Sequence, residues 1–182
     1  MFCHRIDDEL ELGLLEPRHA AALYRLVEEN RAYLGRWLSW VADTRTPEAV
    51  EAFIQRGLEQ FARGDGFQAG IWYRGELVGT TGLHHLDRHA GSTELGYWLA
   101  EALQGRGVMT RVVRGLCRLL FGQYGVKRLE IRCQPANTRS CAIPERLGFS
   151  REGVLRQVEV VDGERVDHVV YGLLGEEWRR HD

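Results

Sequence analysis

Polar and hydrophobic positions in the first third of the chain predict one strand followed by two helices. Residues 9–15 (ELELGLL) alternate with a period of two, which is typical of a half-buried strand. A helical spacing of leucine and valine follows over residues 17–27, and its opening proline suits the first helical position. Thr46 before Pro47 has the pattern of a helix cap, and Gly64 is expected to end this second helix.

The middle of the chain predicts three strands and a long helix. Residues 67–86 contain two strand patterns joined at Arg74-Gly75, and residues 92–100 (STELGYWLA) form a third. From Gly107 the period changes to 3.6, which places a hydrophobic stripe on one face of a helix. The opposite face is expected to carry outward-pointing arginines, namely Arg111, Arg114 and Arg118.

The last third of the chain predicts a strand, a short helix and a hairpin. Residues 128–134 (RLEIRCQ) have a strand pattern, residues 137–148 a helical one, and residues 153–174 form two strands around Asp162-Gly163. The whole order, β-α-α-β-β-β-α-β-α-β-β, predicts one α/β (α+β) domain over residues 1–182. Its single central sheet is expected to be mixed and largely antiparallel, with about seven strands flanked by about four helices.

The composition is that of one folded unit. The 182 residues are 44% hydrophobic and 27% charged, which suffices to bury a core and is unlike a disordered chain. No apolar run approaches the roughly 18 residues that cross a bilayer, and the acidic start does not fit a signal peptide, so we expect a cytoplasmic protein. The net charge of −2 argues against general nucleic-acid binding and against a membrane anchor.

Cysteine and histidine spacing predicts no metal site. The four cysteines contain no C-x-x-C pair, and no histidine lies at zinc-finger spacing from them. His84 and His85 follow a predicted strand and His168 lies within one. For these histidines a structural role is favoured over catalysis or ligation.

Positive charge and glycine coincide in one segment. Between Glu101 and Glu130 there is no acidic residue but there are six basic ones, and residues 104–110 (QGRGVMT) lead into the long helix. Glycines let backbone N–H groups turn inward, and a helix start carries unpaired amides and positive charge, so this loop suits a diphosphate. A Walker loop is absent, and a dinucleotide fingerprint lacks its third glycine, where Thr110 stands. A turn that only starts a helix remains the alternative.

The same segment resembles a known family. Gln104-x-x-Gly107-x-Met109 is similar to the acyl-CoA pyrophosphate loop of the GNAT N-acetyltransferases, Q/R-x-x-G-x-G/A, with Met109 departing at the last position. Further pieces resemble the RimJ/RimL-type branch, which acetylates protein N-termini: Trp37-Leu38-x-Trp40, GYWL at 96–99, QGRGVMT, Asn137-x-x-Ser140 and Leu147-Gly148-Phe149. The resemblance covers essentially residues 9–174.

The resemblance implies acetyl-CoA as cosubstrate, without a metal. The residues that would hold its diphosphate are Gln104, Gly105, Arg106, Gly107, Val108, Met109, Thr110 and Arg111. Arg106 and Arg111 are preferred over the later arginines as phosphate partners. The strand at 92–100 would diverge from its neighbour and free a backbone N–H near Trp98 or Leu99 for the developing oxyanion. Asn137 would bind the pantetheine arm, and helix capping is an equally open role for it.

In this family an amine attacks the thioester directly. The resemblance therefore implies a group that donates a hydrogen bond or a proton to the leaving thiolate, and a base that deprotonates the amine, but no nucleophilic side chain of the enzyme. The family's tyrosine position holds Pro144, which leaves Ser140 as the candidate near the leaving sulfur. Glu94 and Glu159 are the candidate bases, and a plain surface role stays open for each. A protein α-amino group needs about 1–1.4 kcal/mol to be neutral at pH 7, whereas lysine needs about 4.6 kcal/mol, so a modest base suits an N-terminus.

The acceptor is expected at an aromatic segment. Tyr33, Trp37 and Trp40 are spaced i, i+4, i+7, which predicts one helical face, and the resemblance places them over the acceptor groove. The leading hypothesis is acetylation of the N-terminal amine of a ribosomal or other protein. A small amine acceptor, such as a polyamine or an aminoglycoside, and a non-catalytic acyl-CoA-binding module are the alternatives. A homodimer is plausible from the resemblance alone.

Overall fold

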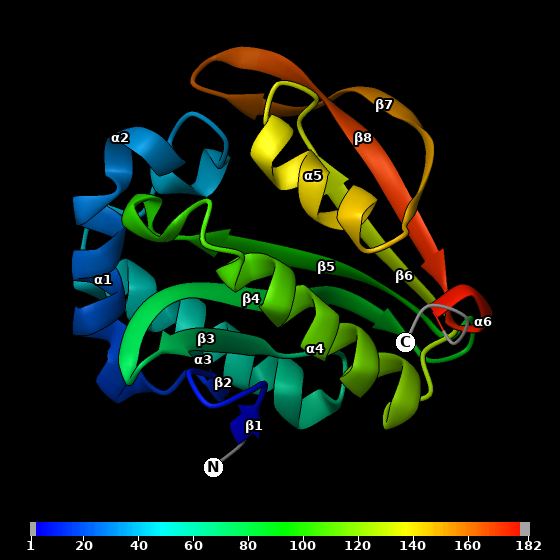
Figure 1. Ribbon diagram of the computed structural model, residues 1–182. Helices are drawn as coiled ribbons and strands as arrows, with labels where there is room; N and C mark the ends of the chain where they lie inside the picture. The colour runs from blue at the N-terminus through cyan, green and yellow to red at the C-terminus, as the bar shows by residue number, and fades with distance from the viewer. Residues whose placement is uncertain (1–2, 179–182) are drawn as a thin grey trace.

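A computed structural model of the chain, which describes residues 3–178, contains one eight-stranded sheet (Figure 1). Its order is β1-β2-β3-β4-β5-β6-β8-β7, and every neighbouring pair is antiparallel except β5–β6. The strands are β1 (Cys3–Arg5), β2 (Leu10–Leu14), β3 (Gln68–Tyr73), β4 (Glu76–Asp87), β5 (Ser92–Leu99), β6 (Arg128–Cys133), β7 (Ser150–Val161) and β8 (Glu164–Leu174).

Helices connect and cover these strands. The α-helices are α1 (Ala20–Glu29), α2 (Arg31–Leu34), α3 (Pro47–Arg63), α4 (Val108–Gly122), α5 (Thr138–Arg146) and α6 (Gly175–Trp178). The 3-10 turns are η1 (Pro17–His19), η2 (Ser39–Val41) and η3 (Glu101–Leu103). The predicted mixed, largely antiparallel fold is confirmed. The prediction of about seven strands missed β1, and the extra helices are single turns too short to show a hydrophobic period.

Local signals fixed the helix ends where they were expected. The Thr46 hydroxyl accepts a hydrogen bond from the Ala49 amide at 3.3 Å, and Pro47 opens α3. Gly64 ends the helix with φ of 73°, a left-handed conformation that glycine adopts without a steric penalty. Some strand boundaries differ from the prediction, and β7, for example, begins at Ser150 rather than at residue 153. His84 and His85 lie inside β4, which continues to Asp87 through a register shift opposite β5.

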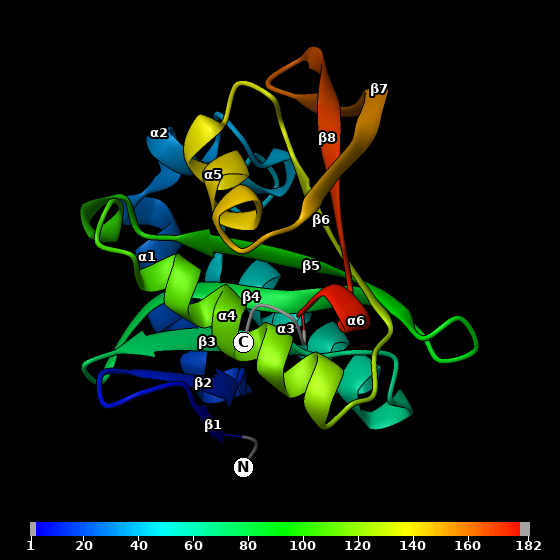
Figure 2. The ribbon, with the colours of Figure 1, turned by 45° about the vertical axis from the view of Figure 1, so that its right-hand side comes forward.

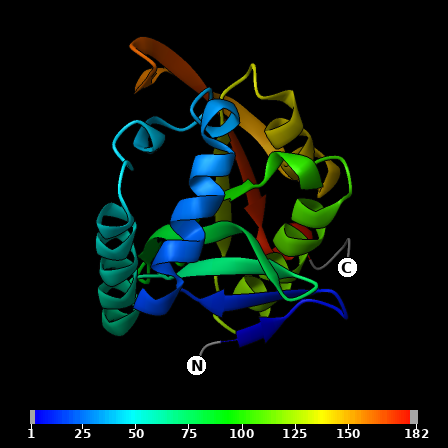
Figure 3. The same ribbon diagram turned by 90° about the vertical axis from the view of Figure 1, so that its left-hand side faces the viewer.

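The helices form a layer on each face of the sheet. Figure 3 shows α1 and α3 on one side and α4 and α5 on the other. The hydrophobic side of α4 packs on the sheet in the main core, and a smaller cluster that includes Leu23 and Ile54 joins α1 and α3. Within residues 3–178 no helix has the length and apolar character to cross a membrane.

The sheet opens at its centre. β5 and β6 pair only from Ser92 to Glu94 and from Arg128 to Glu130, and beyond these residues the two strands separate (Figure 1). The β7–β8 hairpin extends past α5, as Figures 1 and 2 both show, and Glu159 of β7 contacts Ser39 of η2. The opening therefore lies between α4, α5, the hairpin and the segment that follows α1.

Candidate active site

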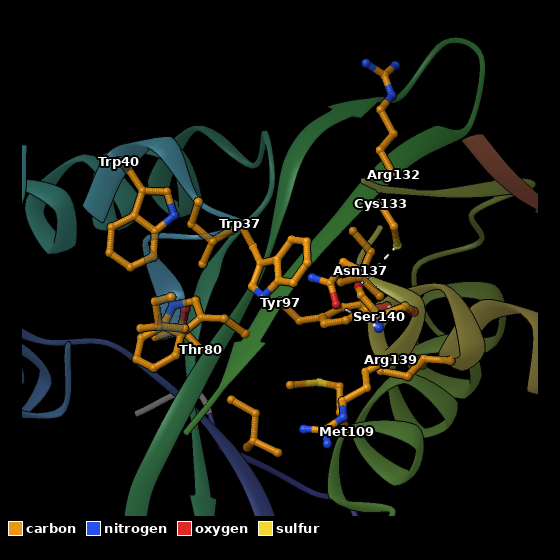
Figure 4. A pocket seen from close by; sticks show the side chains of 18 of the residues that line it. Trp37, Trp40, Thr80, Tyr97, Met109, Arg132, Cys133, Asn137, Arg139 and Ser140 are labelled. Atoms are coloured by element: carbon orange, nitrogen blue, oxygen red, sulfur yellow. Dashed lines mark hydrogen bonds between the residues drawn. The ribbon is translucent and has the colours of Figure 1, made fainter. Parts of the chain in front are cut away.

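One large cavity of about 1520 Å³ occupies this opening. Figure 4 shows Trp37 and Trp40 on one side of it and Asn137, Ser140 and Arg139 of α5 on the other. It is lined by nearly all the predicted site residues: Glu94, Ser140, Glu159, Trp98, Leu99, Gln104, Gly105, Gly107, Val108, Met109, Thr110, Arg111, Asn137, Tyr33, Trp37 and Trp40. Arg106 is exposed and does not line the cavity. The topology thus gathers segments that are up to 126 residues apart in the chain, from Tyr33 to Glu159.

The glycine loop has the geometry expected of an anion cradle. Gly105 and Gly107 have φ of 72° and 75°, and no heavy atom lies within 4 Å of where a Cβ would stand on either. The first bond within α4 is donated by the Arg111 amide to the Gly107 carbonyl at 3.0 Å. The amides of residues 108–110 precede that bond and have no partner within the helix, and these three residues line the cavity.

The charge distribution of the loop differs from the prediction at Arg111. Its guanidinium donates to both carboxylate oxygens of Asp7, at 2.8 and 2.6 Å, and to Glu9 at 3.1 Å. These hydrogen bonds raise the pKa of Arg111 and lower the pKa of Asp7. Arg111 is therefore paired with residues between β1 and β2, and its side chain is 33% exposed, whereas Arg114 and Arg118 are exposed as expected.

Two arginines of α5, which the sequence interpretation did not consider, lie next to the loop instead. Arg139 donates to the Gln104 side chain, and Arg146 donates to the Thr110 hydroxyl at 2.9 Å. They are seven residues apart, which places them on the same face of a helix. This spacing is visible in the sequence. To connect it with the glycine loop, one must also know that α5 packs beside the start of α4, and the sequence pattern does not show this.

The separation of β5 from β6 frees backbone amides toward the cavity. The Ala100 amide donates to the Val78 carbonyl at 2.8 Å, and Leu99 is paired with Gly79 of β4. Because amides alternate along an antiparallel ladder, the N–H of Trp98 is directed to β4 and that of Leu99 to the side where β6 has diverged. The geometry therefore favours Leu99 over Trp98 as the oxyanion donor, while the Trp98 side chain lines the cavity.

The start of α5 holds the predicted asparagine and serine. The Asn137 side chain accepts a hydrogen bond from the Ser140 amide at 3.2 Å. Asn137 therefore caps α5, which is the alternative role that the sequence left open for it. The Ser140 hydroxyl lies 3.2 Å from the thiol of Cys133, and both residues line the cavity. Cys133 is buried, and its hydrogen bond with Cys141 together with burial raises the pKa of its thiol.

The two candidate bases have different surroundings. Glu94 lies 3.3 Å from the guanidinium of Arg132, which also pairs with Glu130 at 2.7 Å. Glu159 accepts from the Ser39 hydroxyl at 2.6 Å and lies 3.0 Å from Nε2 of His168. Both carboxylates line the cavity. Of the partners named here, only Arg132, which lies beside Glu94, carries a permanent positive charge.

The aromatic segment is not the continuous helical face that its spacing predicted. α2 ends at Leu34, and Leu38 is extended with φ of −129° and ψ of 109° before Trp40 enters η2. The aromatic rings still meet in the cavity, with Trp40 and Trp98 separated by 6.1 Å between centroids. The side chain of Gln134, at the end of β6, donates to the Trp37 carbonyl at 2.9 Å and ties this segment to the sheet.

Comparisons with known proteins identify the family of this chain. Over 98% of its length the chain is 35% identical to YdaF of Bacillus subtilis strain 168, provisionally named a ribosomal N-acetyltransferase, and covers 98% of it. It is 26% identical over 93% of its length to the ribosomal-protein-serine acetyltransferase of Escherichia coli K12, of which it covers 95%. The solved structure of RimL, a ribosomal L7/L12 α-N-protein acetyltransferase in complex with coenzyme A, superposes with a TM-score of 0.93 at 26% identity, covering 97% of this chain and 99% of that one. Residues 9–150 match the model of the acetyltransferase (GNAT) domain, so the chain belongs to the GNAT acetyltransferase family and is an acyltransferase.

Proposed function

We propose that this protein transfers the acetyl group of acetyl-CoA to the N-terminal amine of a ribosomal protein. The Escherichia coli relative and RimL are named as acetyltransferases of ribosomal proteins, and RimL binds coenzyme A. The observation that carries the proposal is that one cavity joins three features: the amides at the start of α4, the diverging edge of β5 and the carboxylate of Glu159. Anion binding, oxyanion stabilisation and proton acceptance can thus act on one bound thioester.

The donor end of the cavity fits a long anionic carrier. The open space beside Gly105 and Gly107 lets the diphosphate approach the unpaired amides at 108–110. Arg139 and Arg146 supply positive charge on the α5 side, where they already contact residues of the loop. We propose these two arginines, with exposed Arg106, as the side chains that meet the phosphates, and Arg111 as an anchor of the fold.

The transfer itself needs no covalent intermediate. Glu159 accepts a proton from the acceptor ammonium, directly or through water, and the neutral amine then attacks the thioester carbonyl, forming the C–N bond. The amide of Leu99 donates to the oxygen on which negative charge develops. As the C–S bond breaks, the attacking nitrogen, which carries one extra proton after the attack, releases it to water and becomes the neutral amide. The Ser140 hydroxyl donates a hydrogen bond to the departing thiolate, which takes up a proton from water.

The acceptor class follows from the proton balance. Neutralising an α-amino group at pH 7 costs about 1–1.4 kcal/mol, and a single carboxylate suffices for it. Neutralising lysine costs about 4.6 kcal/mol, which would require a stronger base or a desolvated amine. Trp37, Trp40 and Trp98 offer flat walls around the place where a peptide end would enter.

The experiment is an acetyl-CoA turnover assay in which a thiol reagent detects released coenzyme A. Peptides that match the N-termini of the host's ribosomal proteins are compared with the same peptides blocked at the α-amine but carrying a free lysine, and with polyamines and aminoglycosides. We expect turnover with some of the free N-termini and little with the blocked peptides. Turnover confined to a small amine would replace the proposal with that alternative, and binding without turnover on any amine would favour a binding module.

A further inference from the structure

The geometry points to His168 as a positioning residue of the acetyl transfer, acting together with Ser39 through the carboxylate of Glu159. The inference rests on the proposed function, because it assumes that Glu159 takes the proton of the acceptor amine. It adds two residues that the sequence patterns did not select: His168 was expected to be structural, and Ser39 was not singled out. Both become visible only when the hairpin β7–β8 and the segment before α3 are placed side by side.

The two contacts are made to opposite oxygens of one carboxylate. The Ser39 hydroxyl donates to Oε1 of Glu159 at 2.6 Å, and Nε2 of His168 lies 3.0 Å from Oε2. An ionised carboxylate can only accept, so Nε2 carries the hydrogen and donates it. The side chains of His168 and Glu159 are 19% and 29% exposed, so the pair is partly withdrawn from water but remains open to the cavity that both line.

An irregularity in β7 creates this arrangement. Leu155 is paired with His168 and Glu159 with Val166, so three residues of β7, 156–158, stand opposite Asp167 alone. The bulge is held by the Gln157 amide, which donates to the Asp167 side chain at 2.9 Å, and Gln157 itself has φ of 54°. His168 is two residues from Val166, so it lies diagonally across the ladder from Glu159 on the same face, within reach of a long side chain.

The double contact has a defined consequence for a base. A glutamate has three side-chain torsions, and its carboxylate must lie within hydrogen-bond reach of the acceptor amine to remove a proton. Two donors on different oxygens restrict that motion, and each oxygen retains a lone pair for the amine or a water. Preorganisation of this kind affects the rate of the chemical step more than the binding of the acyl donor.

The contacts exclude a second interpretation of these three side chains. In a nucleophilic triad the serine donates to the imidazole, which removes its proton. Here the Ser39 hydroxyl is bound to the carboxylate, and the imidazole is bound to the other oxygen of that carboxylate. The imidazole therefore does not contact Ser39 as a base would, and the arrangement orients Glu159 rather than activating Ser39.

Ser39 also links the base to the acceptor side of the cavity. It opens η2, between the cavity-lining residues Trp37 and Trp40, and the segment is tied to β6 through Gln134. The carboxylate is thus held from the sheet by His168 and from the aromatic segment by Ser39. A change in that segment reaches Glu159 through one hydrogen bond.

The test compares His168→Ala with His168→Gln, whose side-chain N–H can replace the Nε2 donor but cannot carry a second proton. We expect His168→Ala to lower kcat about tenfold, with the KM for acetyl-CoA changed less than about twofold, and His168→Gln to recover most of the loss. His89→Ala, at an exposed position between β4 and β5, is the matched control and should behave as wild type. Equal kcat for His168→Ala and wild type would overturn the inference, as would a Gln variant as slow as the Ala variant.

A double-mutant cycle tests whether the effect passes through Glu159. In a Glu159→Gln background, His168→Ala should cause little further loss of kcat, and an undiminished tenfold loss there would overturn the inference. Ser39→Ala should follow the same pattern, and it carries the test if circular dichroism shows that His168→Ala does not fold. Absence of amine-dependent turnover by wild-type protein would instead reject the proposed function, so the two failures are distinguishable.

Discussion

The hydroxyl of Tyr97 donates a hydrogen bond to the backbone carbonyl of Ser140 at 3.3 Å. That carbonyl would normally accept from the amide of residue 144, one turn further along α5, but Pro144 has no N–H. Burial raises the pKa of Tyr97 well above its usual value, so the phenol stays protonated and remains a donor. A side chain of β5 thus supplies the bond that a proline within α5 removed.

Tyr97→Phe is expected to cost about 1–3 kcal/mol in the free energy of unfolding, because it leaves the Ser140 carbonyl without this partner. In a Pro144→Ala background the amide of residue 144 can donate to that carbonyl, so Tyr97→Phe should cost clearly less there. Urea denaturation of the four proteins measures the coupling. A cost of Tyr97→Phe that is the same in both backgrounds would show that the hydroxyl does not compensate for the proline.

Gly107→Ala should weaken acetyl-CoA binding, measured by calorimetry, at least tenfold. A side chain at this φ of 75° strains the backbone by about 1–2 kcal/mol. The methyl group of alanine would also enter the open space through which the diphosphate approaches the amides. Gly75→Ala is the matched control: Gly75 has φ of 83°, has no heavy atom within 4 Å of its Cβ position, and lies outside the cavity lining. Both variants should lose similar stability, and equal affinity in the two would place the cradle elsewhere.

Glu159→Gln should lower kcat by about 10²-fold or more while the affinity for acetyl-CoA stays within about twofold. Glu94→Gln should have a smaller effect on kcat, because Glu94 is paired with Arg132 and its charge is partly compensated. Steady-state kinetics on a peptide acceptor compares the two variants at saturating acetyl-CoA. A larger loss for Glu94→Gln would assign the base to β5 instead of β7.

Asp7→Asn should destabilise the fold by about 0.5–1 kcal/mol at neutral pH, the usual size for an ion pair whose partners are 33% and 34% exposed. Asparagine keeps the oxygen that accepts from the amides of Glu9 and Leu10, at 2.9 and 3.0 Å, so the change removes the Asp7 charge beside Arg111 and leaves Arg111 paired with Glu9 alone. Because the folded-state pKa of Asp7 is lowered, mainly by its hydrogen bond from Arg111, this stability is present above the unfolded pKa and disappears as the pH falls through the folded one.

Urea denaturation of wild type and Asp7→Asn at pH 7 and near pH 3 measures this difference. Asp8→Asn is the control, because Asp8 is 98% exposed where it pairs with Arg5. It should change stability by less than about 0.5 kcal/mol at either pH. A difference between Asp7→Asn and wild type that persists undiminished in acid would show that the pair with Arg111 does not cause it.

Features of this protein that depend on residues close together in the sequence could be predicted from the sequence. Thr46, Pro47 and Gly64 define α3 through their own hydrogen bonds and backbone torsions. The glycine loop before α4 was recognised in the same way, because glycine conformations and free amides at a helix start are local properties. Together with the order of strands and helices, these local signals determined the fold class and indicated a loop that suits a diphosphate.

Only the tertiary structure decided which charges and side chains are available to the site. Arg111 is occupied by Asp7, 104 residues away, and Ser39 reaches Glu159 across 120 residues. The extended conformation at Leu38, which breaks the expected aromatic face, and the bulge that turns Glu159 toward His168 both arise where segments distant in sequence pack together. The physical reason is that these contacts depend on the positions of two elements at once, whereas a pattern along the chain reports the preference of one.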